Sequence, residues 1–446
     1  MIQNQNMTIK FRAALRNELR GWIEKGIISG ETADALSGQY QLNNIREESS
    51  RLLSAVIFTI GGLLLGGGLI SFVAANWEDI STPVKLAILF SSLLGFHVTG
   101  YWLWQLKDWR RLGHALIFCG CLVFGASIGL VAQIFHITGN WYGAFGAWAV
   151  GSLVMAWAVR SWIIGALALF TSFLWFVGFQ DDNHERLALL YPLALLASLI
   201  PLAFSVGSRV LYGGTLLGVV FAAGVLAGTD GGGKHLLFAM ASGGLLIWSL
   251  SGLHRTLKVR EEFKEITTGL GLSLLAATAY VWSFHDLWSR SRMEQFPSPL
   301  AISFIVLSIV AAYVILRAER QPQLRLEIGV LAAGAILCAS SLLAGKVARD
   351  GEVLFTMAAN LAALILAAVV IGFSLIEERR AAFWLGTLYV VLLVLSRFLE
   401  YETSLLIKSL AFLACGVAVI FAGMGYETYL RGKDSSAGPD NISITT

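Results

Sequence analysis

The sequence is poor in charged residues and in proline. Charged residues make up 14% of the 446 residues and hydrophobic residues 56%, whereas soluble domains carry about 25% charged residues. Only 7 prolines occur against 46 glycines. This composition excludes an ordinary soluble protein and is typical of helices that pack closely inside a bilayer. The small net charge of +3, with basic residues scattered among short loops, argues against a nucleic-acid partner.

The sequence also lacks the motifs of disulfide, metal and nucleotide chemistry. Its four cysteines lie inside apolar runs and form no CxxC pair: Cys119, Cys121, Cys338 and Cys415. That placement argues against a disulfide framework or a zinc site. No phosphate-binding GxxxxGK[ST] loop occurs in the chain. We therefore expect no metal and no cofactor.

What the sequence does contain is a series of long apolar runs. Such a run spans the hydrocarbon core at about 20 residues, and its backbone must then be helical to satisfy its own hydrogen bonds. By this criterion we predict an all-α, polytopic bundle of about 14 transmembrane helices. The predicted spans are 52–75, 84–105, 112–134, 140–159, 161–179, 187–205, 209–227, 235–253, 264–284, 299–316, 326–344, 353–376, 381–398 and 404–426.

The loop charges predict the direction of this bundle. Most of the 32 Lys and Arg residues fall in the N-terminal segment and in every second loop, and such residues favour the cytoplasmic side. We therefore expect both termini in the cytoplasm. The predicted regions are a cytoplasmic N-terminal helical region (1–51), a first membrane region of four spans (52–160), a remaining bundle (161–430) and a disordered cytoplasmic tail (431–446).

The N-terminal region predicts a short helical pair. Two apolar stripes at helical spacing mark its helices: Phe11, Leu15, Leu19 and Trp22, then Ala33, Leu36 and Tyr40. Gly26 is placed to end the first helix, and Ser29 is placed to cap the second. Residues 8–48 can be interpreted as a docking site for a cytoplasmic protein partner, as a surface-lying anchor, or as a cap packed on the cytoplasmic loops.

Polar residues converge at the non-cytoplasmic end of the first four predicted spans. They are Asn76, Trp77 and Glu78 at the end of the first span, Gln133 and His136 at the end of the third, and Asn140 and Trp141 at the start of the fourth. The i,i+3 spacing of Gln133 and His136 predicts one shared helix face. One interpretation is a small site of amide, imidazole and carboxylate groups. The other is a set of polar helix terminators with an interfacial belt of tryptophans.

Polar side chains within the predicted spans are candidates for function because they are costly in a bilayer. His97 lies inside the second span and Asn360 inside the twelfth, and Glu327 begins the eleventh. No span carries the pair of acidic residues that proton-coupled carriers and intramembrane proteases use. Pro192 and Pro201 fall in the sixth span and predict a kink there.

Three elements of the sequence resemble a known family. They are Trp22–Ser29 (WIEKGIIS), Phe72–Trp77 (FVAANW) at the end of the Gly-rich first span, and Ala132–His136 (AQIFH). Together they resemble prokaryotic membrane proteins that carry the DUF2157 domain, over about residues 8–160 of this chain. The resemblance implies a multi-pass protein of the bacterial cytoplasmic (inner) membrane. It carries no activity and therefore transfers no catalytic residue.

Three functions remain open at this point. The number of helices and the kinked sixth span favour transport or permeation of a small solute or lipid. The N-terminal helices favour a non-catalytic scaffold or sensor. The polar residues around His136 favour a membrane-embedded envelope enzyme, although the sequence as a whole favours a protein that is not an enzyme. Beyond the lipid bilayer, the sequence indicates neither a substrate nor an oligomeric state.

Overall fold

A computed structural model gives the conformation of most of the chain. It describes residues 15, 18–19, 21–23, 25–39, 80–181, 188–227, 233–258, 260–285, 302, 305–310, 312, 324–344, 351–377, 379–400 and 404–436. The chain divides into two compact units, Met1–Ile88 and Leu89–Thr446.

The first unit contains the predicted helical pair. Leu19 is buried against Leu15, Trp22, Ile28 and Leu36, which form a small core of their own. Gly26 adopts the left-handed conformation (φ +68°) that ends helices. The Ser29 hydroxyl accepts a 3.2 Å hydrogen bond from the Thr32 N–H and so caps α2 (Gly30–Gln39). Both local predictions are confirmed, while Phe11 and Tyr40 lie outside the described residues.

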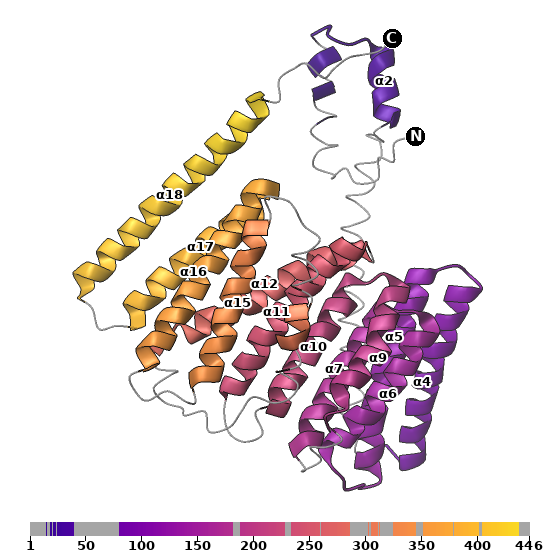
Figure 1. Ribbon diagram of the computed structural model, residues 1–446. Coiled ribbons are helices and arrows are strands. Elements are labelled where there is room, and N and C mark those ends of the chain that lie inside the picture. The colour runs from indigo at the N-terminus through magenta and orange to yellow at the C-terminus, as the bar shows by residue number, and fades with distance from the viewer. Residues whose placement is uncertain are drawn as a thin grey trace. The chain divides into compact units, whose positions relative to one another are not determined.

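The second unit is a helical bundle, and Figure 1 shows most of its helices side by side. Its helices are α4 (Thr82–Gln105, beginning in the first unit), α5 (Arg110–Ile134), α6 (Trp141–Val159), α7 (Trp162–Asp181), α9 (Tyr191–Val206), α10 (Arg209–Ala227), α11 (Gly233–Leu257), η2 (Glu261–Phe263), α12 (Lys264–Trp282), α15 (Leu324–Ala344), α16 (Gly351–Glu377), α17 (Arg380–Glu400) and α18 (Leu405–Ser436). Each coincides with a predicted span, apart from the short η2. The predicted spans 52–75 and, for the most part, 299–316 lie outside the described residues.

Many of these helices have the length and composition of membrane spans. Among the described residues, 9 helices are long and apolar enough to cross a membrane. Large apolar side chains such as Val154, Leu388 and Leu413 are more than 60% exposed on the bundle surface, which suits contact with lipid. The described part of the chain is therefore all-helical, and the protein is a multi-pass membrane protein.

The 9 described helices that are long and apolar enough to cross a membrane are fewer than the predicted 14. Part of the difference lies in predicted spans outside the described residues, and part has physical reasons. Helix α9 has 16 residues, or roughly 24 Å at 1.5 Å per residue, which is short for a bilayer. Helix α12 begins with Lys264 and Glu265 and carries several Ser and Thr residues, which lower its hydropathy. The number of spans stays a prediction.

Two details of the predicted spans are wrong. The sixth begins later than predicted, so Pro192 lies in the first turn of α9, where proline costs no hydrogen bond. Only Pro201 lies inside that helix. The polar tail was expected to be disordered from residue 431, but α18 continues to Ser436. No proline interrupts residues 405–436, and extending a formed helix is easy compared with starting one.

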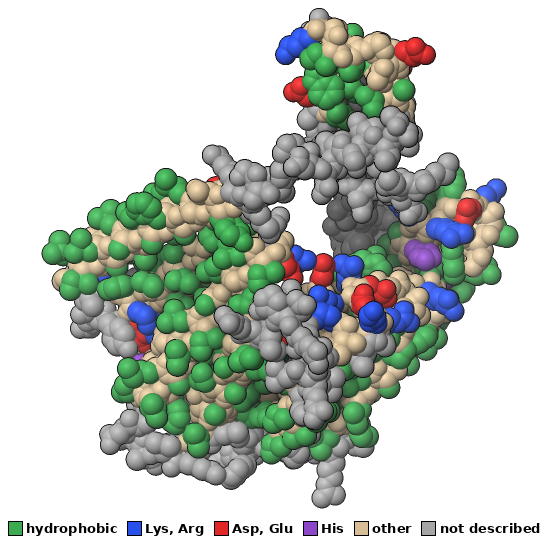
Figure 2. Space-filling view, turned by 45° about the horizontal axis from the view of Figure 1, so that its top comes forward, with side chains coloured by type: hydrophobic (Ala, Val, Ile, Leu, Met, Phe, Trp, Pro, Cys, Tyr) green, Lys and Arg blue, Asp and Glu red, His purple; other side chains and the backbone are tan. Residues whose placement is uncertain are grey.

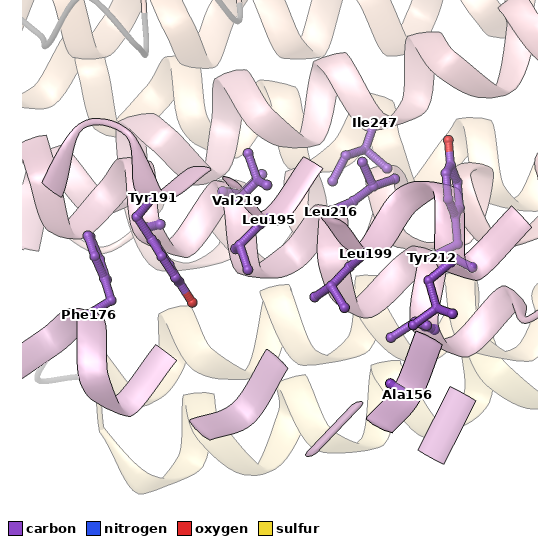
Figure 3. Close-up of a cluster of buried hydrophobic side chains, with 14 of the residues drawn as sticks. Ala156, Phe176, Tyr191, Leu195, Leu199, Tyr212, Leu216, Val219 and Ile247 are labelled. Atoms are coloured by element: carbon purple, nitrogen blue, oxygen red, sulfur yellow. The ribbon is translucent and has the colours of Figure 1, made fainter. Parts of the chain in front are cut away.

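The bundle has two hydrophobic cores. The first joins α5–α7 to α9–α11, and Figure 3 shows its side chains from Phe176 and Tyr191 to Leu216 and Ile247. The second is built from α11, α12 and α15–α17, around Leu275, Leu337 and Leu366. Helices α11 and α12 contribute to both cores. They therefore connect the two halves of the bundle.

Glycine allows α11 and α12 to approach closely. A Cβ atom at Gly271 would lie 2.5 Å from the backbone nitrogen of Trp248 and 2.7 Å from its Cα. These atoms belong to the backbone and cannot rotate away. The position therefore requires glycine, as in the small-residue contacts that bring membrane helices together.

Candidate functional site

The predicted site near His136 is not built on one helix face. Helix α5 ends at Ile134, and His136 adopts a left-handed conformation (φ 52°). The Ile137 N–H donates 2.9 Å to the carbonyl of Ala132, which closes the end of the helix. Gln133 and His136 are both exposed. The prediction of a shared i,i+3 face is therefore wrong, because the helix stops between the two residues.

The start of α6 carries the other described residues of this prediction. Asn140 precedes the helix and donates from Nδ2 to the Tyr142 hydroxyl at 2.5 Å. Trp141 is 60% exposed and contacts the rings of Tyr142 and Phe145 edge-on. Asn76, Trp77 and Glu78 lie outside the described residues. Within the described part of the chain, no group of three His, Cys, Asp or Glu residues is placed to hold a metal ion.

The two polar residues inside spans have local hydrogen-bond partners. His97 bonds through Nδ1 to the Leu93 carbonyl one turn earlier (2.8 Å), and its ring packs directly on Gly120 of α5. Asn360 donates to the carbonyls of Thr356 (2.8 Å) and Ser283 (3.3 Å). His97 thus fills a helix–helix contact, whereas Asn360 connects α16 to the end of α12.

The second half of the bundle contains a cavity of about 570 Å³, within the range of small-ligand sites. It lies among α11, α12, α15, α16 and α17, with Arg209 of α10 at its mouth. Charged residues line one end: Arg209, Arg255, Glu261, Glu262, Lys264, Glu265, Glu327, Glu377 and Arg379. Figure 2 shows acidic and basic side chains gathered together on one face of the molecule, between largely hydrophobic flanks. We call the charged residues that line this end of the cavity the charged mouth.

Alternating ion pairs cross the charged mouth. Glu265 of α12 bonds through one oxygen to Arg209 (3.4 Å) and through the other to Arg379 (2.9 Å). Arg379 also pairs with Glu377 at 3.1 Å. These side chains are roughly half exposed, so each pair stabilises the fold by only about 0–1 kcal/mol. They are therefore weak contacts that a ligand can replace.

One ion pair of the mouth is of a different kind. Glu327 of α15 is only 3% exposed and pairs with Arg255 of α11. Separating a buried pair of this kind is costly because the remaining charge has left water and lost its partner. The pair fixes the end of α15 beside α11, and both residues line the cavity.

The deep part of the cavity is mostly apolar. It is lined by Leu272, Ser273, Leu366, Val370, Phe373 and Tyr389. The Tyr389 hydroxyl donates to the Ala276 carbonyl at 2.7 Å. Ala276 lies roughly 18 Å along α12 from Lys264 at 1.5 Å per residue. The cavity thus extends from the charged ends of the helices past the middle of α12.

Beyond the cavity, the opposite ends of α12 and α17 are joined by a second polar cluster. The guanidinium of Arg397 donates to the Ser283 carbonyl, pairs with Glu400 and lies 4.2 Å from the centre of the Phe284 ring. Glu400 accepts a 2.7 Å hydrogen bond from the His285 N–H. A cation at the carboxyl end of a helix is electrostatically favourable. We call these residues, together with Asn360, the far-end cluster.

Comparison with known proteins bears on the first part of the chain. Residues 20–164 match the family model DUF2157, described as a predicted membrane protein. The match covers about a third of the chain. This confirms the resemblance seen in the sequence. No curated protein and no solved structure matches the chain.

The cavity lies entirely outside the matched residues 20–164, since its first lining residue is Arg209. The sequence singled out Glu327 as a polar candidate at the start of a span, whereas Arg209, Arg255 and Arg379 served only to orient the loops, and no site was predicted there. One signal was available. Glu261, Glu262, Glu265, Glu327 and Glu377 all fall at the same predicted end of their spans as these arginines. The positive-inside rule explains Lys and Arg at one end of several helices, but it does not explain the glutamates there, so charges of both signs indicate a candidate site.

Proposed function

We propose that the protein binds a small lipid-like amphiphile in the cavity of α11, α12 and α15–α17 and moves it between the two faces of the membrane. The polarity of the cavity is the observation that supports this proposal. Its charged mouth and apolar depth follow the polarity of a membrane leaflet, from the interface to the hydrocarbon centre. A carrier of a water-soluble solute would instead need polar groups at the bilayer centre.

The direction of the bundle adds to the proposal. With both termini in the cytoplasm of a bacterial cell, as the loop charges favour, the charged mouth faces the cytoplasm and the far-end cluster faces outward. The substrate then enters from the cytoplasmic leaflet of the inner membrane. Leu385, which lines the cavity and is 66% exposed, provides an apolar side to that entrance.

The test is lipid movement in vesicles that contain the full chain. Lipids with a fluorophore on one acyl chain are placed in both leaflets, and a membrane-impermeant reductant bleaches those in the outer leaflet. We expect the protein to raise the bleached fraction well above the half seen in protein-free vesicles. Ser273→Trp fills the cavity and is expected to abolish the effect. Leu361→Trp, on the exposed surface of α16, serves as the matched control.

Equal bleaching with and without protein, for lipids of several headgroups, would remove the proposal. Equal loss in Ser273→Trp and Leu361→Trp would also count against it, because lipid movement would then not depend on the cavity.

A second candidate function is docking of a cytoplasmic protein by the helical pair. It is favoured by the separate core around Leu19 and by two apolar side chains beside it, Ile23 (44% exposed) and Ile27 (64% exposed). A double Ile23→Asp, Ile27→Asp variant would lose a co-purifying protein while leaving lipid movement unchanged. Unchanged co-purification would argue against this role.

A further inference from the structure

We infer that the cavity selects amphiphiles whose headgroup carries one positive and one negative charge. This inference rests on the proposed function and names its substrate class. It follows from the order of charges across the mouth, Arg209–Glu265–Arg379–Glu377. Each glutamate or arginine inside this series already bonds a residue of opposite sign.

A headgroup of one sign cannot enter between Glu265 and Arg379 without bringing like charges together, even though Glu265 keeps Arg209 and Arg379 keeps Glu377 as partners. An anionic headgroup that binds Arg379 displaces Glu265, whose carboxylate then lies beside the incoming anion. A cationic headgroup that binds Glu265 displaces Arg379, whose guanidinium then lies beside the incoming cation. A zwitterion avoids both outcomes, because its anion replaces the carboxylate while its cation replaces the guanidinium.

The exchange takes place at Glu265 and Arg379 rather than deeper in the mouth. Both side chains are more than half exposed, so their bond opens easily. Glu327 is 3% exposed and held by Arg255, and this pair positions the adjoining helix ends. Glu265 and Arg379 are therefore the residues that determine headgroup specificity.

The apolar part of the ligand continues along α12. From Glu265 the exposed face of this helix runs through Gly269 to Ser273, which line the cavity together with Val370 and Leu385. A chain that begins at Glu265 thus meets small and apolar groups as it goes deeper. A free headgroup without a chain leaves this surface unfilled, so it is expected to bind weakly.

The test is binding of bromine-labelled lysolipids to the full chain in neutral detergent. Bromine on the chain quenches nearby tryptophan, and Trp248 lines the cavity. The signal is the difference in quenching between the natural chain and Trp248→Phe. Three probes share one brominated chain and differ in headgroup: phosphocholine (zwitterionic), phosphate (anionic) and trimethylammonium (cationic). We expect phosphocholine to bind about tenfold more tightly than either other probe.

Two variants assign this preference to its residues. Glu265→Gln is expected to bring the phosphate probe within about twofold of phosphocholine, and Arg379→Gln to do the same for the trimethylammonium probe. Glu427→Gln is the matched control, because Glu427 pairs with Arg380 at 3.4 Å through similarly exposed side chains away from the cavity. It is expected to leave the preference unchanged.

The outcomes separate this inference from transport itself. Zwitterion preference without lipid movement would leave the inference standing and remove the proposed function. Lipid movement with equal affinity for the three headgroups would support the proposed function and overturn this inference. Displacement of the probe by equimolar glycerophosphocholine, which has no acyl chain, would overturn the claim that the ligand is a lipid-like amphiphile. Quenching that is identical in the natural chain and Trp248→Phe would overturn the site.

Discussion

Glu327 illustrates how a single buried charge organises this bundle. It lies at the start of α15 with 3% of its surface exposed, and its partner Arg255 comes from the end of α11. Removing its carboxylate leaves Arg255 without that partner. We expect Glu327→Ala to lower the free energy of unfolding by about 3 kcal/mol, the lower end for a buried pair because Arg255 is partly exposed.

The measurement is denaturant unfolding in mixed micelles. Glu427→Ala is the control, since its pair with Arg380 is exposed, and it is expected to change the free energy of unfolding by less than about 1 kcal/mol. Equal effects of the two substitutions would mean that burial of Glu327 contributes nothing to stability.

Leu19 gives a second prediction at this scale. It is the buried centre of the helical pair, at 3% exposure, whereas Ile27 is 64% exposed. Leu19→Ala is expected to destabilise the pair by about 2–5 kcal/mol and to speed protease cleavage within residues 1–40. Ile27→Ala should leave the cleavage rate nearly unchanged. Slow cleavage in both variants would contradict the small core.

Residue roles were predictable from sequence where the cause is local. Gly26 and Ser29 end and begin helices through the conformation and hydrogen bonding of a few neighbouring residues. The pairing of Arg255 with Glu327, 72 positions apart, depends on how α11 and α15 pack. No local pattern encodes it. The prediction for His136 was wrong for another reason: the helix ends at Ile134, as predicted, and i,i+3 spacing places two residues on one face only where the helix includes both.

At the scale of helices, the close approach of α11 and α12 leads to a prediction. Gly271 of α12 meets the backbone of Trp248, while a Cβ at Gly269, two residues earlier on the same helix, would meet nothing within 4 Å. Gly271→Ala is therefore expected to push α11 from α12 and to cost about 1–3 kcal/mol. Gly269→Ala should be neutral or stabilising by up to about 1 kcal/mol, because alanine favours helix.

Thermal unfolding of the two variants in the same detergent measures this difference. Lipid movement should fall in Gly271→Ala as well, since Trp248 and Leu272 line the cavity. A melting temperature for Gly271→Ala equal to that of Gly269→Ala would show that α11 and α12 do not approach as closely as described.

The helices themselves were largely predictable. Apolar runs such as 209–227 and 381–398 correspond to α10 and α17 within a few residues, since a membrane span is defined by its own length and hydropathy. Helix ends were less predictable. The last turns of α18, from Arg431 to Ser436, are polar, and hydropathy identifies the membrane-embedded part of a helix rather than its full length.

At the scale of the whole molecule, composition predicted the class of protein but not the place of its cavity. The shortage of charge led to a membrane bundle, and the polar residues of the first four spans drew attention to the region around His136. The cavity instead forms where α11, α12 and α15–α17 enclose space between them. That arrangement depends on packing between segments far apart in sequence, on which hydropathy carries no information.

The far-end cluster supplies the prediction that tests the molecule as a unit. The cavity ends near Tyr389, and beyond it Arg397 connects α17 to the Ser283 carbonyl at the end of α12. If lipid crosses along α12 and α17, this bond must open in each cycle. Arg397→Gln keeps a hydrogen-bond donor but loses the charge that binds Glu400. The barrier at the closed end is therefore expected to fall, and lipid movement to become severalfold faster.

The rate of bleaching in vesicles measures this effect, with Arg380→Gln as a control that removes an exposed arginine from the other end of α17. The same Arg397→Gln substitution should lower the melting temperature, because the ends of α12 and α17 lose a common contact. Faster movement together with lower stability is the signature of a gate, since a bond that holds the closed state also opposes opening. Lower stability with unchanged or slower movement would make the far-end cluster a structural joint, and the lipid path would then have to leave the bundle on the mouth side of Tyr389.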